Sequence, residues 1–235
     1  MRGESRFSPR YIFLEHKSQN TMRSCRGGST HYIAVPRRLL RRLDTDVTLA
    51  LQRGRRVLRW KRKLDIVVFN TRESTVRATH TGGYGLSTIA ILIYLDCSAR
   101  DIRSVIARWL PAAIHHELAH IVRNAERGYG ETLLETMVSE GVASYAEHVL
   151  NPPLRIPYTQ KIKGEDRWLR QAQREFPKRR YDHSAWYFGT DRPPRWIGYR
   201  LGYRIAEQFM RRYPGMQLAE LVRLPAKKVY QRAMG

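Results

Sequence analysis

The residues with the clearest chemical meaning in this chain are two histidines and a glutamate in one apolar run. His116-Glu117-Leu118-Ala119-His120 has the form His-Glu-x-x-His. On an α-helix, positions i and i+4 lie on one face, so His116 and His120 can bind one metal ion while Glu117 stands beside it. The pattern therefore predicts a zinc site on a helix.

A third metal ligand is expected further along the chain, at Glu140. This residue lies in a second helix-like run, residues 133–146, which can fold back antiparallel and deliver a carboxylate oxygen. Two histidines and one glutamate leave the fourth position of a tetrahedral zinc open for water. The alternative is that the histidines are ordinary helix residues and Glu140 is an exposed carboxylate. The combined spacing favours one zinc per chain, bound by His116, His120 and Glu140.

His115 is a different case from its neighbour His116. It is rotated by about 100° around the helix and so lies off the face that binds metal. We therefore expect His115 to be a packing or surface residue.

Further motifs carry a resemblance to known proteins over much of residues 60–213. The spacing of the three ligands is similar to that of the gluzincin metallopeptidases, in which two histidines and a glutamate from the next helix bind zinc. The wider set resembles a bacterial family described as predicted zinc-dependent proteases of unknown substrate. Its motifs are Gly82-Gly83-Tyr84, the apolar strand before the helix, Ile121-Val122-Arg123, the Ser-Glu-Gly-x-Ala run at Glu140, Trp186-Tyr187-Phe188-Gly189, and Trp196-Ile197-Gly198-Tyr199 with Gly202-Tyr203.

The resemblance implies an α+β fold of the gluzincin-like type, with a small N-terminal sheet followed by a helical half that carries the zinc site. It also implies that a strand near residues 84–92 lines the cleft and pairs with the main chain of a peptide substrate. Gly83, Tyr84 and Ile91 are the substrate-binding candidates. The alternative is a plain core strand.

The chemistry expected at such a site is hydrolysis of a peptide bond. Zinc lowers the pKa of its bound water, and Glu117 is the natural base that takes the water proton and passes it to the departing amine. Tyr199 and Tyr203 are candidates to stabilise the oxyanion, the alternative being an aromatic helix face in the core. His183 and Arg200 are further candidates, either of which could instead satisfy a surface carboxylate.

Two residues are expected to lie just behind the ligands. Arg123, three residues after His120, could orient Glu140 or Glu147, the alternative being a structural salt bridge. Ser144 lies one turn after Glu140, where many gluzincins carry an acidic partner, and so departs from that pattern.

Composition limits the class of protein. The 235 residues are 42% hydrophobic, enough for one domain with a full core, and no apolar run approaches the roughly 20 residues of a membrane span. No hydrophobic signal region is present near the N-terminus, so we expect a cytoplasmic protein. Cys25 and Cys97 are far apart and are expected to be free thiols.

The net charge of +22 is the second strong signal, and 35 of the 43 basic residues are Arg. Such a charge attracts polyanions at low salt, and we expect any such contact to be non-specific. The alternative is that the charges are dispersed on solvated faces, because they form no recognised DNA-reading motif.

The elements expected from the patterns place the site in the second half of the chain. We expect a tail over residues 1–30 and one metallopeptidase-like domain over 31–235, with helices and sheet in 31–100 and helices in 101–235. Strands are expected at 31–35, 64–70, 75–79 and 88–95, with a turn at 82–85; helices are expected at 37–43, 47–60, 101–109, 112–123, 132–150 and 197–213, with one or two more in 217–234. Residues 151–185 are the least readable, and a loop is expected around 186–196.

Three functions are compatible with these observations. The first is a zinc metallopeptidase that acts on a peptide or protein substrate. The second is a stress-linked, repressor-cleaving metallopeptidase, against which the lack of a helix-turn-helix signature counts. The third is a non-catalytic, nucleic-acid-associated protein on a metallopeptidase fold, recognisable by salt-sensitive DNA binding that persists after Glu117 is neutralised.

Overall fold

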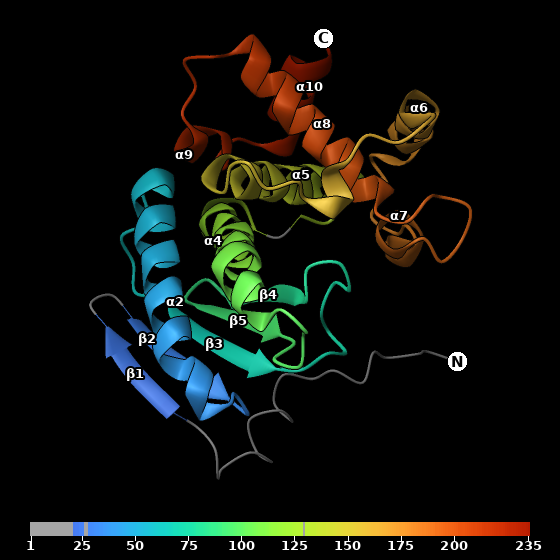
Figure 1. Ribbon diagram of the computed structural model, residues 1–235. Coiled ribbons are helices and arrows are strands. Elements are labelled where there is room, and N and C mark those ends of the chain that lie inside the picture. The colour runs from blue at the N-terminus through green and yellow to red at the C-terminus, as the bar shows by residue number, and fades with distance from the viewer. Residues whose placement is uncertain (1–20, 26–27, 129) are drawn as a thin grey trace.

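The computed structural model describes residues 21–25, 28–128 and 130–235 and has an α+β architecture (Figure 1). Within these residues, five strands form one sheet in the order β1-β2-β3-β5-β4. The strands are β1 (Thr21–Cys25), β2 (Gly28–Ile33), β3 (Asp65–Asn70), β4 (Thr81–Ser87) and β5 (Ala90–Leu95). The inner pairs β2–β3 and β3–β5 are parallel, whereas β1 and β4 run antiparallel to their neighbours. β4 is therefore one of the two strands at the ends of the sheet.

Helix α2 (Arg37–Leu58) and helix α4 (Leu110–Arg127) cover one face of this sheet (Figure 1). The alternation of the strands explains the packing, because Ile66, Val68, Ile91 and Ile93 all point to the helical side and join the main core. Val67 and Leu92 point the other way and form a smaller cluster with Ile33. The sheet is thus a platform on which α4 rests.

The helical half is built around α4 and α5 (Leu133–Leu150), which α8 (Ile197–Arg212) and α10 (Ala226–Met234) cover from the side away from the sheet (Figure 1). Short elements complete it: α3 (Ile102–Ser104), the π-helix η1 (Val105–Trp109), the 3-10 helix η2 (Pro157–Thr159), α6 (Glu165–Glu175), α7 (His183–Phe188) and α9 (Leu218–Leu221). A sheet followed by helices confirms the expected fold class at the α+β level.

Several boundaries differ from the expectation for physical reasons. The two helices expected at 37–43 and 47–60 are one, because residues 44–46 continue the helix between them. Gly54 does not interrupt α2; it lies where an added Cβ would come 2.7 Å from the Leu118 side chain. Residues 82–85 are not a turn but lie in β4, since pairing with β5 overrides the turn preference of glycine. In place of the strand expected at 75–79 there is only a single bridge between Val76 and Thr81.

Further differences concern the start and the middle of the chain. The sheet begins at Thr21, inside the segment for which we expected a tail, while residues 1–20 lie outside the described part. Residues 186–188 belong to α7 rather than to a loop. Pro111 falls in the first turn of α4, and the π-helix η1 precedes it directly, so the helical backbone continues through the proline.

The cysteines and the apolar character of the helices were also the subject of expectations. Cys97 is a free, buried thiol, and burial raises its pKa to about 11; the side chain of Cys25 lies outside the described part. None of the helices in the described ranges combines the length and the apolar character that crossing a membrane requires.

Candidate metal centre

Two helices supply the candidate ligands, and the sequence fixes both of them locally. α4 carries His116 and His120 on one face. α5 begins at a capping box in which the Thr132 and Glu135 side chains and backbone amides bond reciprocally, which fixes where its first turn starts. α5 then lies against α4 and brings Glu140 to the two histidines.

The three ligand atoms form a nearly equilateral triangle. His116 Nε2 and His120 Nε2 are 3.2 Å apart, and Glu140 Oε2 is 3.3 Å from each of them. All three side chains are buried. Across the described residues, no other group of three His, Cys, Asp or Glu side chains brings its ligand atoms together in this way.

This triangle has the dimensions of one face of a zinc coordination tetrahedron. Zn–N and Zn–O bonds of about 2.0 to 2.2 Å place neighbouring tetrahedral ligands about 3.3 to 3.6 Å apart. The observed separations of 3.2 and 3.3 Å lie within about 0.1 Å of the short end of that range. Two imidazoles and one carboxylate are also a ligand set that zinc accepts with one position left over. The residues present therefore fit zinc.

The other ring nitrogens of the two histidines have their own partners. His116 Nδ1 lies 3.0 Å from Glu147 Oε2, and His120 Nδ1 lies 3.2 Å from Ser139 Oγ. Glu147 in turn accepts a hydrogen bond from the Tyr158 hydroxyl. The Glu147 carboxylate accepts a hydrogen bond and so favours the proton on His116 Nδ1, which directs Nε2 of that ring toward a metal. The Ser139 hydroxyl helps to hold the His120 ring in place.

The electrostatics of the cluster follow from burial and from its opposite charges. Burial alone would lower the pKa of His116, but hydrogen bonds with Glu140 and Glu147 outweigh it and raise that pKa well above its usual value. Burial alone would raise the pKa of Glu140, yet the neighbouring His120 and His116 hold it well below its usual range. The carboxylate of Glu140 is thus kept in the ionised form that a metal ligand needs.

Glu117 points into a cavity of about 260 Å³ beside the ligands. Its carboxylate lies against Gly83 of β4, where an added Cβ would come 2.6 Å from Glu117 Oε1, so position 83 has no room for a side chain. Burial raises the pKa of Glu117, and the nearby His116 and His120 only partly oppose this. β4 and α4 therefore form two walls of one cavity.

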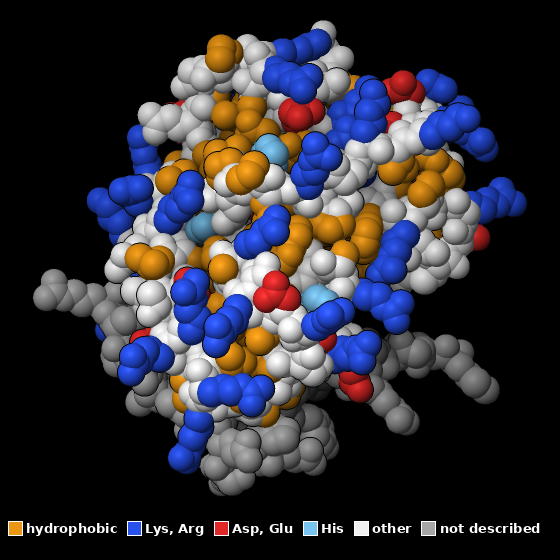
Figure 2. Space-filling view, in the orientation of Figure 1, with side chains coloured by type: hydrophobic (Ala, Val, Ile, Leu, Met, Phe, Trp, Pro, Cys, Tyr) orange, Lys and Arg blue, Asp and Glu red, His pale blue; other side chains and the backbone are white. Residues whose placement is uncertain are grey.

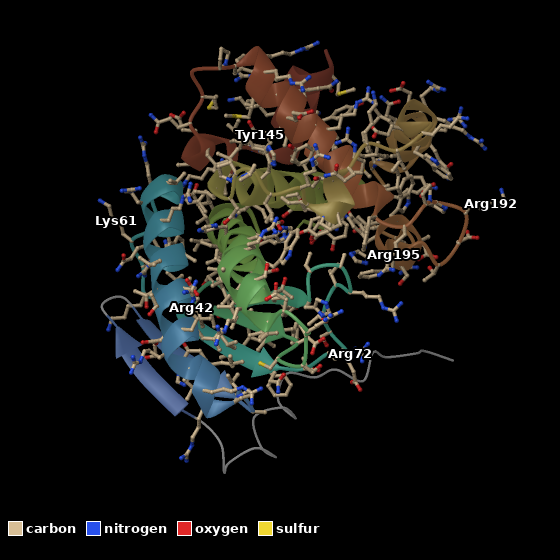
Figure 3. All side chains as sticks on the ribbon, in the orientation of Figure 1. Arg42, Lys61, Arg72, Tyr145, Arg192 and Arg195 are labelled. Carbon is tan, nitrogen blue, oxygen red and sulfur yellow. The ribbon has the colours of Figure 1, made fainter. Side chains whose placement is uncertain are left out.

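Of the two candidate tyrosines, only Tyr199 lines this cavity, together with Tyr158 and Trp196. Tyr203 instead packs its ring 5.9 Å from that of Tyr145, between α5 and α8 (Tyr145 is labelled in Figure 3). Burial raises the pKa of Tyr203 to about 12. The structure places Tyr199, but not Tyr203, in the cavity beside the candidate ligands.

The substrate-binding candidates are also separated by the structure. Gly83 lines the cavity, and Tyr84 follows it on β4 with its side chain 49% exposed. Ile91 is fully buried in the main core on β5, so its side chain cannot touch a substrate. We correct that assignment.

The two residues expected behind the ligands do not contact them. Arg123 donates to the carbonyls of Val222 and Leu224, at 3.1 and 2.9 Å, and so ties α4 to the C-terminal segment rather than orienting Glu140. Ser144 is fully buried, and its hydroxyl has no hydrogen-bond partner among the described residues. The partner of His116 is Glu147, two turns after Glu140; its place on the same face of α5 was the available sequence signal.

The remaining polar candidates serve packing. His115 is buried and its Nε2 lies 2.9 Å from the Ala50 carbonyl, in agreement with a packing role. Arg200 pairs with Glu165 at 2.6 Å and also donates to the Thr159 carbonyl. His183 stacks on Tyr187 at 4.5 Å between ring centres.

Comparison with known proteins gives one match. Residues 44–231 match a family model described as a predicted Zn-dependent protease (DUF2268). No curated protein and no solved structure matches the chain. The matched region contains all three candidate ligands, the cavity and the tyrosines beside it, and it covers most of the chain. The chain therefore belongs to this family of predicted Zn-dependent proteases.

Proposed function

We propose that this protein is a zinc metallopeptidase of the gluzincin type, with one zinc per chain bound by His116, His120 and Glu140. The observation that carries the proposal is the triangle of ligand atoms, 3.2 to 3.3 Å on each side, with the Glu117 carboxylate in the adjoining cavity. Zinc held by such ligands supplies Lewis acidity, which makes water a stronger nucleophile at neutral pH and a carbonyl a stronger electrophile.

Glu117 has the position that a general base needs. It is buried, directly follows His116 in the sequence, and lines the cavity together with His116. In the proposed reaction Glu117 takes a proton from the attacking water and then delivers it to the nitrogen of the departing amine. One peptide bond and one water are consumed, and a carboxylate and an amine are formed.

Tyr199 is the proposed stabiliser of the oxyanion. It comes from α8 and lines the same cavity as His116, Glu117 and Gly83. A phenol hydroxyl that donates to the developing negative charge adds to the effect of the metal.

The substrate is proposed to bind along β4. This strand is at the end of the sheet order, and its backbone at Gly83 passes directly over Glu117. An extended peptide that pairs with the open edge of β4 would run past the metal ligands, and the exposed Tyr84 side chain would lie beside it.

The experiment that tests this function is metal-dependent cleavage of a peptide library by the full chain. Products are identified by mass spectrometry for the protein as purified, after treatment with a chelator, and after Zn²⁺ is added back. We expect cleavage that disappears with the chelator and returns with Zn²⁺. Cleavage that is unaffected by the chelator would refute a metal mechanism, and no cleavage by zinc-loaded protein would refute the peptidase proposal.

A further inference from the structure

A groove that the proposed reaction does not use runs along the outer face of α2, where α3, η1 and the start of α4 lie against it. Three connected hollows form the groove, with volumes of about 700, 310 and 550 Å³. The first two share Ala107, and the last two share Leu49 and Arg53. From Arg38 to Arg56 the helix rises about 27 Å, which is the length of the groove along α2.

The rim of this groove is strongly basic. Its cations are Arg38, Arg42, Arg53 and Arg56 from α2, with Arg103 and Arg108 from the facing helices. Figure 2 shows that Lys and Arg side chains predominate over the surface that α2 forms, and Figure 3 labels Arg42 on this helix.

The acidic side chains near the groove do not neutralise it. Asp46 is the one carboxylate among its described lining residues, and it is already paired with Arg42 at 2.5 Å. Arg53, Arg56 and Arg108 make no ion pair with any residue that the structure describes. The groove therefore presents a row of unneutralised positive charge.

The floor of the groove is apolar. Pro111 is partly exposed there, and Leu39 and Leu154 lie at the bottom with 8% and 5% of their surface exposed. Leu49, in the middle of α2, is 57% exposed and lines two of the three hollows beside Arg53, so it adds an accessible apolar side chain to the groove. No Phe, Tyr or Trp lines the groove in the described ranges, so it lacks the stacking surfaces on which single-stranded nucleic acids are bound.

We propose that this groove binds an acidic, amphipathic polypeptide segment, with its apolar side chains on the floor and its carboxylates on the arginine rim. Charge complementarity favours an acidic partner, and the exposed Leu49 favours one that also carries apolar side chains over a purely charged polymer. The groove shares α4 with the metal centre but opens on different residues, so binding here does not depend on the peptidase activity.

The test uses a synthetic peptide of about 18 residues, which as a helix matches the length of the groove. Its Glu residues and its Leu residues are placed on opposite faces. A second peptide replaces every Leu by Ser at equal charge, and a third probe is a single-stranded oligonucleotide of equal charge. Binding to the full chain is measured by fluorescence anisotropy at about 150 mM salt, where long-range attraction by the net charge is screened.

We expect the Leu peptide to bind at least about tenfold more tightly than the Ser peptide, because burial of one or more Leu side chains is worth that much. The double substitution Arg53→Glu with Arg108→Glu should weaken binding of the Leu peptide by about tenfold or more. Leu49→Gln should lower the affinity for the Leu peptide several-fold and leave the affinity for the Ser peptide unchanged.

The matched control is Arg170→Glu with Arg174→Glu, which makes the same change in net charge on exposed positions of α6. Binding should be almost unchanged in this variant. Equal loss in the control would overturn the proposal in favour of dispersed charge. Equal binding of the Leu and Ser peptides, or tighter binding of the oligonucleotide, would overturn it in favour of a general polyanion surface, and both comparisons need only the unsubstituted protein.

Discussion

Glu147 connects the candidate metal ligands to a part of the chain that the motif does not contain. It lies 3.0 Å from His116 Nδ1 on one side and accepts from the Tyr158 hydroxyl on the other. Burial and the nearby Glu147 raise the pKa of Tyr158 well above its usual value, so this tyrosine stays a neutral donor. Glu147 is therefore the residue that fixes the orientation of the His116 ring.

Replacing Glu147 by Ala should weaken zinc binding by about 10- to 100-fold, the usual effect of removing a carboxylate that orients a ligating histidine. The affinity is measured by competition with a zinc chelator of known strength. Ser144→Ala is the matched control on the same helix, since the Ser144 hydroxyl has no partner among the described residues. Equal zinc affinity of the Glu147→Ala variant and the unsubstituted protein would show that His116 needs no such support.

The two tyrosines of α8 make a paired test of oxyanion stabilisation. Tyr199→Phe should keep zinc and folding but lower kcat by about 10² to 10³, or about 2.7 to 4 kcal/mol of transition-state stabilisation. Tyr203→Phe should have little effect on kcat, because Tyr203 packs on Tyr145 away from the cavity. Loss of activity in Tyr203→Phe but not in Tyr199→Phe would contradict this assignment.

The cluster of His116, His120 and Glu140 could be predicted from the sequence because its geometry is local. The i and i+4 spacing of His116 and His120 needs only a helix, and Glu140 needs only a second helix that returns. Tyr158 could not be found in this way, because it comes from a segment without periodicity and reaches the site only through tertiary packing. The partners of Arg123 lie about a hundred residues later in the chain, so no local pattern could indicate them.

The crossing of α5 and α8 depends on two glycines. An added Cβ on Gly141 would lie 2.0 Å from the backbone of Gly202, and one on Gly202 would lie 2.0 Å from the Met137 carbonyl. At both glycines the added Cβ would meet backbone atoms of the other helix. A change of side-chain rotamer could therefore not relieve either clash. This close approach sets α8, which carries Tyr199, against α5, which carries Glu140.

Gly141→Ala should therefore destabilise the protein by at least about 1 to 3 kcal/mol, the typical cost of overpacking a core. The free energy of unfolding is measured by urea titration. Gly215→Ala is the control, since no atom lies within 4 Å of the added Cβ there. A Gly141→Ala variant as stable as the control would mean that the two helices do not cross at this distance.

Among the elements, helices were predicted better than strands. The long helices follow from their apolar spacing, and their observed limits lie close to the expected ones at 132–150 and 197–213. β4 was missed because Thr81–Ser87 contains three glycines and resembles a turn in isolation. Its extended conformation comes from pairing with β5, and its glycines are needed where the backbone meets Glu117.

The proposed zinc would connect the two central helices of the molecule, α4 and α5, through three buried side chains. Removal of zinc should therefore lower the stability of the whole chain as well as its activity. A ligand that binds only the folded state raises the free energy of unfolding by about 4 kcal/mol when its concentration is 1,000 times Kd. We expect Tm to fall on chelation and to recover with added Zn²⁺, as measured by calorimetry.

The control for this effect is His120→Ala, which lacks one ligand. Its Tm should be insensitive to both chelator and Zn²⁺, because a site with two remaining ligands binds zinc weakly. A variant that responds to Zn²⁺ as strongly as the unsubstituted protein would place the metal elsewhere.

The most direct test of the central claim is to measure zinc content and peptide hydrolysis on the same samples of the unsubstituted protein and of Glu117→Gln. The substitution keeps the size of the side chain and its hydrogen-bonding head but removes the base. Zinc content should be unchanged, while single-turnover cleavage of the peptide library should fall by about 10² to 10⁴. Equal cleavage by the two proteins would contradict the account, because the hydrolysis would then not come from this site.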